Sequence, residues 1–316
     1  MTTSIANYLI ASLTIIVSAI SVGLSQGLTN KAAFESIDIQ PHIKDKISNL
    51  SLLSSALIET SAIVSVFVAL ILLFEDTQAI NPFYSDLAKI GIGFAIIGSG
   101  LIIGLFSAWP AQEACYATAR QPFHAQSIFN FTLIVLSVIQ TPLILAFIVA
   151  LFIKVQATLI ASLADSLRLI GAGIAIGLGS IGPAIGLAHF ARTAIKGIGS
   201  NRNAYGRILT FTFISQAIIE SPTIFSLVTS LFLLGSVPKT LIAGIAMLMA
   251  GITTGLGMFG PGLSSGRTAA AACKEIATNP EQYSALARTS IFAQGVIDSA
   301  AIYVLLIALG FILFVS

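Results

Sequence analysis

The chain has 316 residues, of which 56% are apolar and only 9% are charged, whereas soluble domains carry about 25% charged residues. This composition excludes an ordinary soluble protein and indicates an integral membrane protein. The formal charge of +2 and the lack of a basic run exclude a nucleic-acid partner. The two cysteines, Cys115 and Cys273, exclude a disulfide framework, and the three histidines have no spaced partner, so neither a metal nor another cofactor is expected.

Eight long stretches are apolar and almost free of charge, and each exceeds the ~20 residues that a helix needs to cross a membrane. In chain order they are 7–28, 49–74, 88–114, 125–153, 168–191, 207–235, 239–266 and 285–315. No alternating segments of ~10 residues, typical of a membrane β-barrel, are visible. The sequence therefore predicts an all-α membrane protein with eight transmembrane helices. Because no basic residue precedes Lys31, the first stretch is expected to be retained rather than cleaved as a signal peptide.

The links between these stretches alternate in character. The polar and charged links, predicted as loops, are 29–48, 115–124, 192–206 and 267–284, whereas 75–87, 154–167 and 236–238 are short or weakly charged. Most Lys and Arg residues lie in the first set or within one helical turn of it. The positive-inside rule then places these loops in the cytoplasm and both termini on the opposite side. The alternative is an accidental bias.

An internal repeat of about eighty residues organises the chain. The segment FTFISQAIIESPTIF (211–225) aligns with TSIFAQGVIDSAAIY (289–303), and LLSSALIETSAIV (52–64) aligns with LIVLSVIQTPLIL (133–145). The equivalent positions are Glu59, Gln140, Glu220 and Asp298, and eighteen residues before them lie Pro41, Pro122, Arg202 and Pro280. The chain is therefore predicted to form four tandem hairpin repeats, 1–80, 81–158, 159–236 and 237–316, all pointing the same way.

Glu59, Glu220 and Asp298 are the charged residues expected deep inside their helices. An ionised carboxylate at the centre of a bilayer costs about 3 kcal/mol on insertion scales, so burial favours the neutral form. Three such groups in register indicate ion carriers that alternate between loaded and unloaded states. The alternative, a structural carboxyl bonded to a neighbouring helix, suits one isolated residue better than three. Gln140 packs like a protonated Glu but cannot release a proton, and is predicted to be an inactive equivalent.

Polar residues accompany the carboxyl positions. Thr60, Ser221 and Ser299 follow directly and offer hydroxyl groups, while Gln216 and Gln294 lie one helical turn before their carboxylates. Individually, such residues are more often contacts between helices. The first helix of each hairpin is rich in small residues, which suits close packing on both sides in an inner ring or, alternatively, ordinary packing of two helices.

Together, the glycine-rich first helix, the ARQP-type loop and the deep carboxylate of the second helix resemble the c subunit of the F-type ATP synthase. QAIIESPTIFSLV (216–228) and QGVIDSAAIYVLL (294–306) are especially similar to it. The c subunit is normally one hairpin, and the related V-type rotors have two, so this chain resembles a four-hairpin fused form. The resemblance implies a ring of copies in the membrane, ion exchange with subunit a, contact with central-stalk subunits, and ATP synthesis in a separate catalytic head, with no catalytic site of its own.

The resemblance also implies roles for loop residues and a choice of ion. Residues that match the stalk-contacting motif wholly or partly are Arg120, Gln121, Pro122, Gln40, Pro41, Asn279 and Pro280, whereas Ser200–Arg202 does not match. Sodium-binding members use a first-helix Gln, a Glu followed by Ser or Thr, and often a Tyr. Gln26 and Thr60 in repeat one, and Ser265, Ser299 and Tyr303 in repeat four, approach this set.

Leu187 and Phe225 replace the polar ligands in repeat three, so the transported ion is expected to be the proton, with sodium as the alternative. The expected location is the inner membrane of a bacterium, in contact with membrane lipid. The sequence is also compatible with a V-type rotor and, more distantly, with a stand-alone ion channel or transporter. A channel would require a polar path along one helix face, whereas polarity here is confined to one level.

Overall fold

The computed structural model describes residues 5–75 and 79–315, and these residues are almost entirely helical. The helices are α1 (Ile5–Ile39), α2 (Lys44–Leu73), α3 (Pro82–Phe106), α4 (Ala108–Arg120), α5 (Ala125–Ile139), α6 (Thr141–Ala157), α7 (Leu163–Gly179), α8 (Ile181–Ser200), α9 (Tyr205–Gly235), α10 (Leu241–Gly257), α11 (Phe259–Thr278) and α12 (Tyr283–Val315). Within the described ranges they form eight rods that are long and apolar enough to cross a membrane. The predicted all-α class and the eight spans are confirmed.

The polar links predicted as loops are helical over most of their length, and that prediction is wrong. For example, α1 continues to Ile39 and α8 continues to Ser200. Each reversal takes one residue followed by a short 3₁₀ turn, as in η1 (Pro41–Ile43) and η4 (Pro280–Gln282). Lys, Glu and Ala favour helices, and a helix that leaves the membrane has no reason to stop while its side chains are good helix formers. Proline then begins the next turn because its missing N–H is not needed there.

Four of the rods are interrupted inside the apolar region. The interruptions are at Ser107 (between α3 and α4), Gln140 (α5 and α6), Ser180 (α7 and α8) and Met258 (α10 and α11). A proline follows each of them by two or three residues, and the prolines are Pro110, Pro142, Pro183 and Pro261. Proline donates no hydrogen bond to the preceding turn, so the helix loosens just before it. Pro222, by contrast, lies inside α9 without interrupting it.

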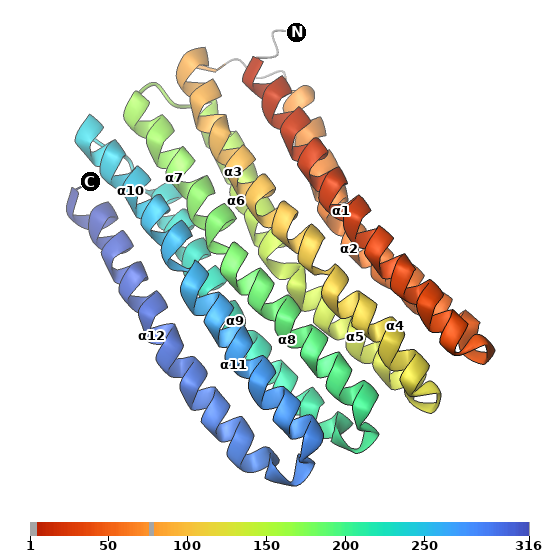
Figure 1. Cartoon of the computed structure of the whole chain (residues 1–316). Helices are drawn as coiled ribbons and strands as arrows, with labels where there is room; N and C mark the ends of the chain where they lie inside the picture. Colours follow the sequence, from red (N-terminus) through yellow and green to blue (C-terminus); the bar gives the residue numbers. More distant parts are fainter. Residues whose placement is uncertain (1–4, 76–78, 316) are drawn as a thin grey trace.

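The rods form two layers. The first helices of the hairpins contact one another in the order α1, α3, α7 and α10, with α4, α8 and α11 continuing the same layer toward the turns. The second helices lie behind them, where α9 contacts both α6 and α12. All four hairpin turns are at one end of the molecule, and the described ends of α1 and α12 are at the other (Figure 1). The hairpins are therefore parallel, with repeats one and four at the two open edges.

Glycines bring the first helices into direct backbone contact. A side chain placed on Gly173 of α7 would overlap the carbonyl group of Gly91 in α3, and one on Gly251 of α10 would overlap that of Gly171. The two glycines of α7 thus face opposite neighbours, and small residues spaced by two allow packing on both sides of one helix. This close layer holds the second helices at fixed spacing behind it.

Two clusters of buried charge lie near the ends of the rods. Opposite the turns, Glu75 accepts hydrogen bonds from Lys89 at 2.5 Å and from Asn7 at 3.0 Å, which ties repeat one to repeat two. At the turn end, Glu113 pairs with Arg120 of its own helix and lies 3.7 Å from Arg192 of repeat three. Both acids are largely buried, and their basic partners compensate the charge.

Candidate functional site

The four equivalent positions of the repeats lie at matched points of the second helices. Each of Glu59, Gln140, Glu220 and Asp298 follows the first residue of α2, α5, α9 or α12 by fifteen residues. At 1.5 Å per residue this is about 22 Å along the helix from the turn end. Because the hairpins are parallel, the four side chains share one level of the molecule.

Hydrogen bonds link this level across the boundaries between repeats. The hydroxyl of Thr60 in repeat one donates to Oε1 of Gln140 in repeat two at 2.9 Å. The hydroxyl of Ser221 in repeat three donates to Oδ2 of Asp298 in repeat four at 2.5 Å. Between repeats two and three, Thr141 holds the equivalent position and lies near the carboxyl of Glu220. The rule is the same each time: the residue after one ion position contacts the ion position of the next repeat.

The two members of this series at the open edges have no such partner among the residues that the structure describes. Glu59, in repeat one, is exposed, and no side chain of the described residues donates a hydrogen bond to it. Ser299, in repeat four, bonds only the carbonyl of Val296 in its own helix, at 2.7 Å. Glu220 and Asp298, inside the series, are partly buried. Each chain thus presents an acceptor at one edge and a donor at the other.

The side chain of Gln140 forms hydrogen bonds through both its amide oxygen and its amide nitrogen. It is 5% exposed, accepts the bond from Thr60, and donates through Nε2 to the hydroxyl of Ser107 at 3.3 Å. Ser107 stands where the first helix of repeat two is interrupted. The amide thereby bridges its own first helix and the second helix of repeat one.

The other predicted supporting residues divide into two groups. Gln294 forms a buried polar cluster, in which Nε2 donates to Ser290 at 3.1 Å and to Ser215 of repeat three at 3.4 Å, and Ser265 donates to its Oε1 at 3.4 Å. Sequence analysis did not single out Ser290 or Ser215, although Ser290 lies one helical turn before Gln294. The cluster connects both helices of repeat four with repeat three.

Three further predicted residues also form no hydrogen bond to a carboxyl among the described residues. Gln26 donates to the backbone carbonyl of Ser55 at 3.2 Å instead. Tyr303 is 65% exposed and makes no described hydrogen bond to Asp298. Gln216 is buried, and its amide atoms have no hydrogen-bond partner among the described residues. The structure therefore does not assemble a sodium-type ligand set from Gln26 and Tyr303 within one chain.

The predicted stalk-contact residues gather at the turn end. Gln40, Gln121 and Asn279 are the single residues at which the chain reverses, and Arg120 is exposed while it pairs with Glu113. Beside them Phe123, which sequence analysis did not name, is 98% exposed. An exposed aromatic ring at the tip of a turn suits contact with another protein.

These features define a class of protein: a membrane protein of parallel helical hairpins whose second helices carry carboxyl groups at one level. The family model of the ATP synthase C subunit matches residues 9–72, 170–233 and 248–311. The chain therefore belongs to the ATP synthase C subunit family, as its sequence resemblance indicated. Glu59, Glu220 and Asp298 each lie fifty residues after the start of their match, and repeat two, which holds Gln140, lies outside the matched ranges.

Known relatives correspond to single hairpins of this chain. The ATP synthase c subunit of Dehalococcoides mccartyi (strain CBDB1) is 44% identical over 71 residues, which is 93% of that protein and 22% of this chain. The ATP synthase c subunit of Prochlorococcus marinus (strain AS9601) is 39% identical over 77 residues, which is 95% of that protein and 24% of this chain. The family assembles into a ring within ATP synthase, and this chain carries several hairpin units of that family in tandem.

Proposed function

We propose that the chain is a proton-carrying rotor subunit of a rotary ATP synthase, with Glu59, Glu220 and Asp298 as the ion carriers. The observation that carries this proposal is that the three carboxyls lie at matched points of their helices. In addition, Ser221 of repeat three donates a hydrogen bond to Asp298 of repeat four. A carboxyl at this depth is stable in lipid when it is neutral. It becomes charged only where another subunit offers water or a basic partner, so loading and unloading are coupled to movement past that subunit.

Gln140 defines the carrying capacity of the chain in this proposal. The amide keeps both hydrogen bonds that a protonated carboxyl would make, but it has no proton to release. Repeat two therefore passes through the cycle as a permanently neutral unit. Each chain carries three ions for four hairpins, which means less work per turn at a given gradient and favours pumping against steep gradients.

The arrangement of ligands favours the proton over sodium. Sodium, like other hard cations, requires several oxygen ligands around one point. Asp298 has the hydroxyl of Ser221 beside it, whereas neither Gln26 nor Tyr303 forms a hydrogen bond to a carboxyl among the described residues. A single hydroxyl donor suffices to orient a carboxyl that binds a proton.

The open edges support a ring made of further copies of the chain. In the proposed ring, Ser299 of one copy donates to Glu59 of the next and repeats the internal pattern of Ser221 and Asp298. Subunit a would meet the second helices, while central-stalk subunits would meet the turn end with Gln40, Pro41, Gln121, Pro122 and Pro280. The bacterial inner membrane, with the turns in the cytoplasm, fits the distribution of basic residues.

Carbodiimide labelling tests the proposal on the purified complex in vesicles. Dicyclohexylcarbodiimide modifies protonated carboxyls in lipid, so peptide mapping should find it on Glu59, Glu220 and Asp298 and not on Asp45, an exposed acid of α2. ATP-driven proton uptake should fall in parallel with labelling. Absence of labelling at all three carboxyls, or unchanged proton uptake after labelling, would overturn the rotor proposal.

The same experiment separates the two ions. If sodium were carried, added sodium would protect the carboxyls from the reagent, because a bound cation replaces the proton. We expect no protection at neutral pH with sodium in excess. Protection that increases with sodium concentration would assign sodium while leaving the rotor proposal intact.

A further inference from the structure

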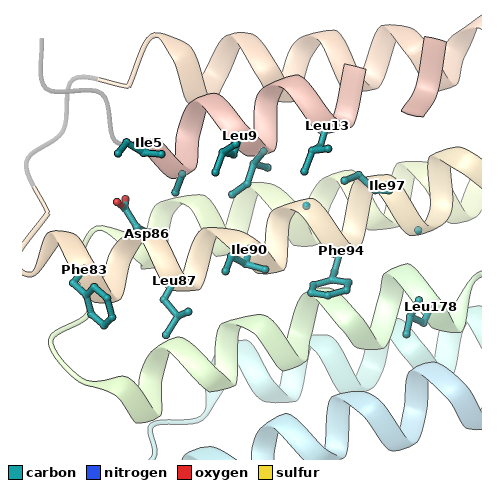
Figure 2. Close-up of a pocket in the computed structure, with 14 residues that line it drawn as sticks. Ile5, Leu9, Leu13, Phe83, Asp86, Leu87, Ile90, Phe94, Ile97 and Leu178 are labelled. Atoms are coloured by element: carbon teal, nitrogen blue, oxygen red, sulfur yellow. The ribbon is translucent and has the colours of Figure 1, made fainter. Parts of the chain in front are cut away.

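A long apolar groove runs between the first helices of repeats one and two. It has a volume of about 740 Å³ and lies between α1 on one side and α3, with Leu178 of α7, on the other (Figure 2). Ile5, Leu9 and Leu13 project from α1 toward it, and Ile90 and Phe94 line its α3 side. Among the described residues that line it, Asp86 contributes the only ionisable side chain.

The groove lies where repeat one lacks the glycine with which repeats two and three approach the next first helix. Gly91 and Gly171 occupy equivalent positions, 49 residues before Gln140 and Glu220, and both approach the backbone of the next first helix closely. Repeat one has Ile10 at that position, which prevents an equally close approach of α1 to α3. Gly93 then lines the groove, where an added Cβ would meet only side chains of Ile10 and Ile97, the nearest at 3.6 Å.

The dimensions and position of the groove fit the tails of a membrane lipid. From Phe83 to Gly98 it follows α3 for fifteen residues, or about 22 Å, close to half of the ~40–45 Å thickness of a bilayer with its headgroups. Apolar cavities remain dry and bind apolar molecules. Helices of the same chain bound the groove on both sides. A further copy would pack against α12 or against the side of α1 that faces away from α3, so it would not fill the groove. Lipid from the leaflet opposite the turns is therefore the occupant that fits.

Asp86 gives the mouth of the groove a chemical preference. It lies in the first turns of α3, at the end opposite the hairpin turns, which is where lipid headgroups of that leaflet lie (Figure 2). Asp86 is partly buried and forms no ion pair within the described residues, because Lys89, three residues on, is bound to Glu75 at 2.5 Å. An uncompensated carboxylate at this level attracts a cationic headgroup and repels a purely anionic one.

We propose that this groove is a binding site for a phospholipid with an ammonium headgroup, whose tails lie along α1 and α3 and whose ammonium group pairs with Asp86. The site is independent of the ion carriers, since none of Glu59, Gln140, Glu220 and Asp298 lines the groove. At this level it gives repeat one a contact that repeats two and three make through Gly91 and Gly171.

The test uses two lipids with identical photoreactive tails, a phosphatidylethanolamine and a phosphatidylglycerol, in vesicles that contain the full complex. After illumination, peptide mapping compares labelling of residues 5–13 and 83–97 with that of 224–232, an exposed face of α9. We expect the ethanolamine lipid to label the groove about fivefold more than the glycerol lipid, which corresponds to ~1 kcal/mol. Both lipids should label the α9 face equally.

Three variants test whether Asp86 sets the headgroup preference and whether the groove is where the lipid binds. Asp86→Asn should remove the headgroup preference while labelling of the groove persists. Gly93→Leu should fill the groove and reduce its labelling by both lipids. Gly206→Leu is the control, because Gly206 at the turn end of α9 has open space around an added Cβ and lies outside the groove, so labelling should not change.

Two outcomes would overturn the proposal. One is equal labelling of the groove by the two lipids in the unmodified chain. The other is labelling that survives Gly93→Leu unchanged. Because Asp86→Asn leaves the apolar packing untouched, its result stands even if Gly93→Leu destabilises the fold. Proton uptake measured on Asp86→Asn separates this site from the proposed rotor function and should be unaffected.

Discussion

At Gln140 an amide replaces a carboxyl while the surrounding hydrogen bonds are kept. Its oxygen accepts from Thr60 and its nitrogen donates to Ser107. A protonated glutamic acid has the same size and can make the same two bonds. The pocket in repeat two is therefore already shaped for an ion carrier.

Replacing this amide by an acid should create a fourth working position. We expect Gln140→Glu to fold normally. Under the proposed function each chain would then carry four ions instead of three, so the number of ions transported per ATP should rise by the same proportion. The ratio is measured in vesicles from the proton gradient that balances a set ATP potential. Gln140→Leu is the control, because it removes the hydrogen bonds without adding a proton site. A ratio that is identical in Gln140→Glu and the unmodified chain would contradict the prediction.

The hydroxyl of Ser221 should matter through its bond across the repeat boundary. Ser221→Ala removes the donor 2.5 Å from Asp298, and a hydrogen bond to a neutral group is worth about 0.5–1.5 kcal/mol. We expect ATP-driven proton uptake to slow by about tenfold, as ~1.4 kcal/mol corresponds to one factor of ten. Ser221→Thr should retain activity, because Thr60 and Thr141 occupy the same position in repeats one and two. Equal rates in the Ala and Thr variants would exclude a role for the hydroxyl.

Among the helices, close contact between α3 and α7 makes the largest demand on side-chain size. Gly173→Ala would place a methyl group onto the carbonyl of Gly91, and backbone atoms cannot move aside as side chains can. We expect a loss of about 1–3 kcal/mol in stability, the usual cost of overpacking. Thermal unfolding in detergent, followed by circular dichroism, measures the change.

Gly295→Ala provides the comparison for this prediction. Gly295 lies inside α12, is exposed and has no atom within 4 Å of an added Cβ, and alanine favours a helix over glycine by about 1 kcal/mol. The two identical substitutions should therefore change stability in opposite directions. Equal effects would mean that close packing of the first helices does not limit stability.

Sequence patterns predicted the helices better than their ends. Eight apolar stretches stand out because a membrane span is long and its composition is extreme, and the repeat fixed which positions correspond. The polar segments such as 192–206 were assigned to loops because charge was taken as the end of a helix, whereas the chain reverses at Asn201 alone. Proline positions are visible in the sequence, but the interruptions at Ser107 and Met258 and the continuity of α9 through Pro222 depend on packing.

The candidate site was predictable in level but not in its partners. Constant spacing places Glu59, Glu220 and Asp298 at corresponding points of parallel helices. The bond from Ser221 to the next repeat depends on how neighbouring hairpins rotate against each other. Exposure of Glu59 follows from its place at the edge of the whole molecule, which no local pattern contains.

For the molecule as a whole, the buried charge cluster of Glu75 and Lys89, opposite the turns, joins repeats one and two. Lys89→Met leaves Glu75 buried without its closest cation, with Lys154 at 3.8 Å as the remaining one. Breaking a buried ion pair costs about 3–5 kcal/mol. We expect detergent-solubilised protein to unfold at markedly lower temperature, as measured by circular dichroism.

A second substitution checks the cause of this loss. Adding Glu75→Gln to Lys89→Met removes the unpaired charge and should recover part of the stability, since an uncompensated charge costs more than an absent pair. If the double variant is less stable than Lys89→Met alone, the ion pair is not what joins the two repeats.

The amide at repeat two also divides the circumference of the proposed rotor unevenly. In a ring built solely from copies of this chain, successive carriers are separated by two hairpins across Gln140 and by one hairpin elsewhere. Each revolution would then consist of repeated sets of one large and two small rotation steps. A bead attached to a slowly turning ring should pause in that pattern, and Gln140→Glu should make the pauses evenly spaced.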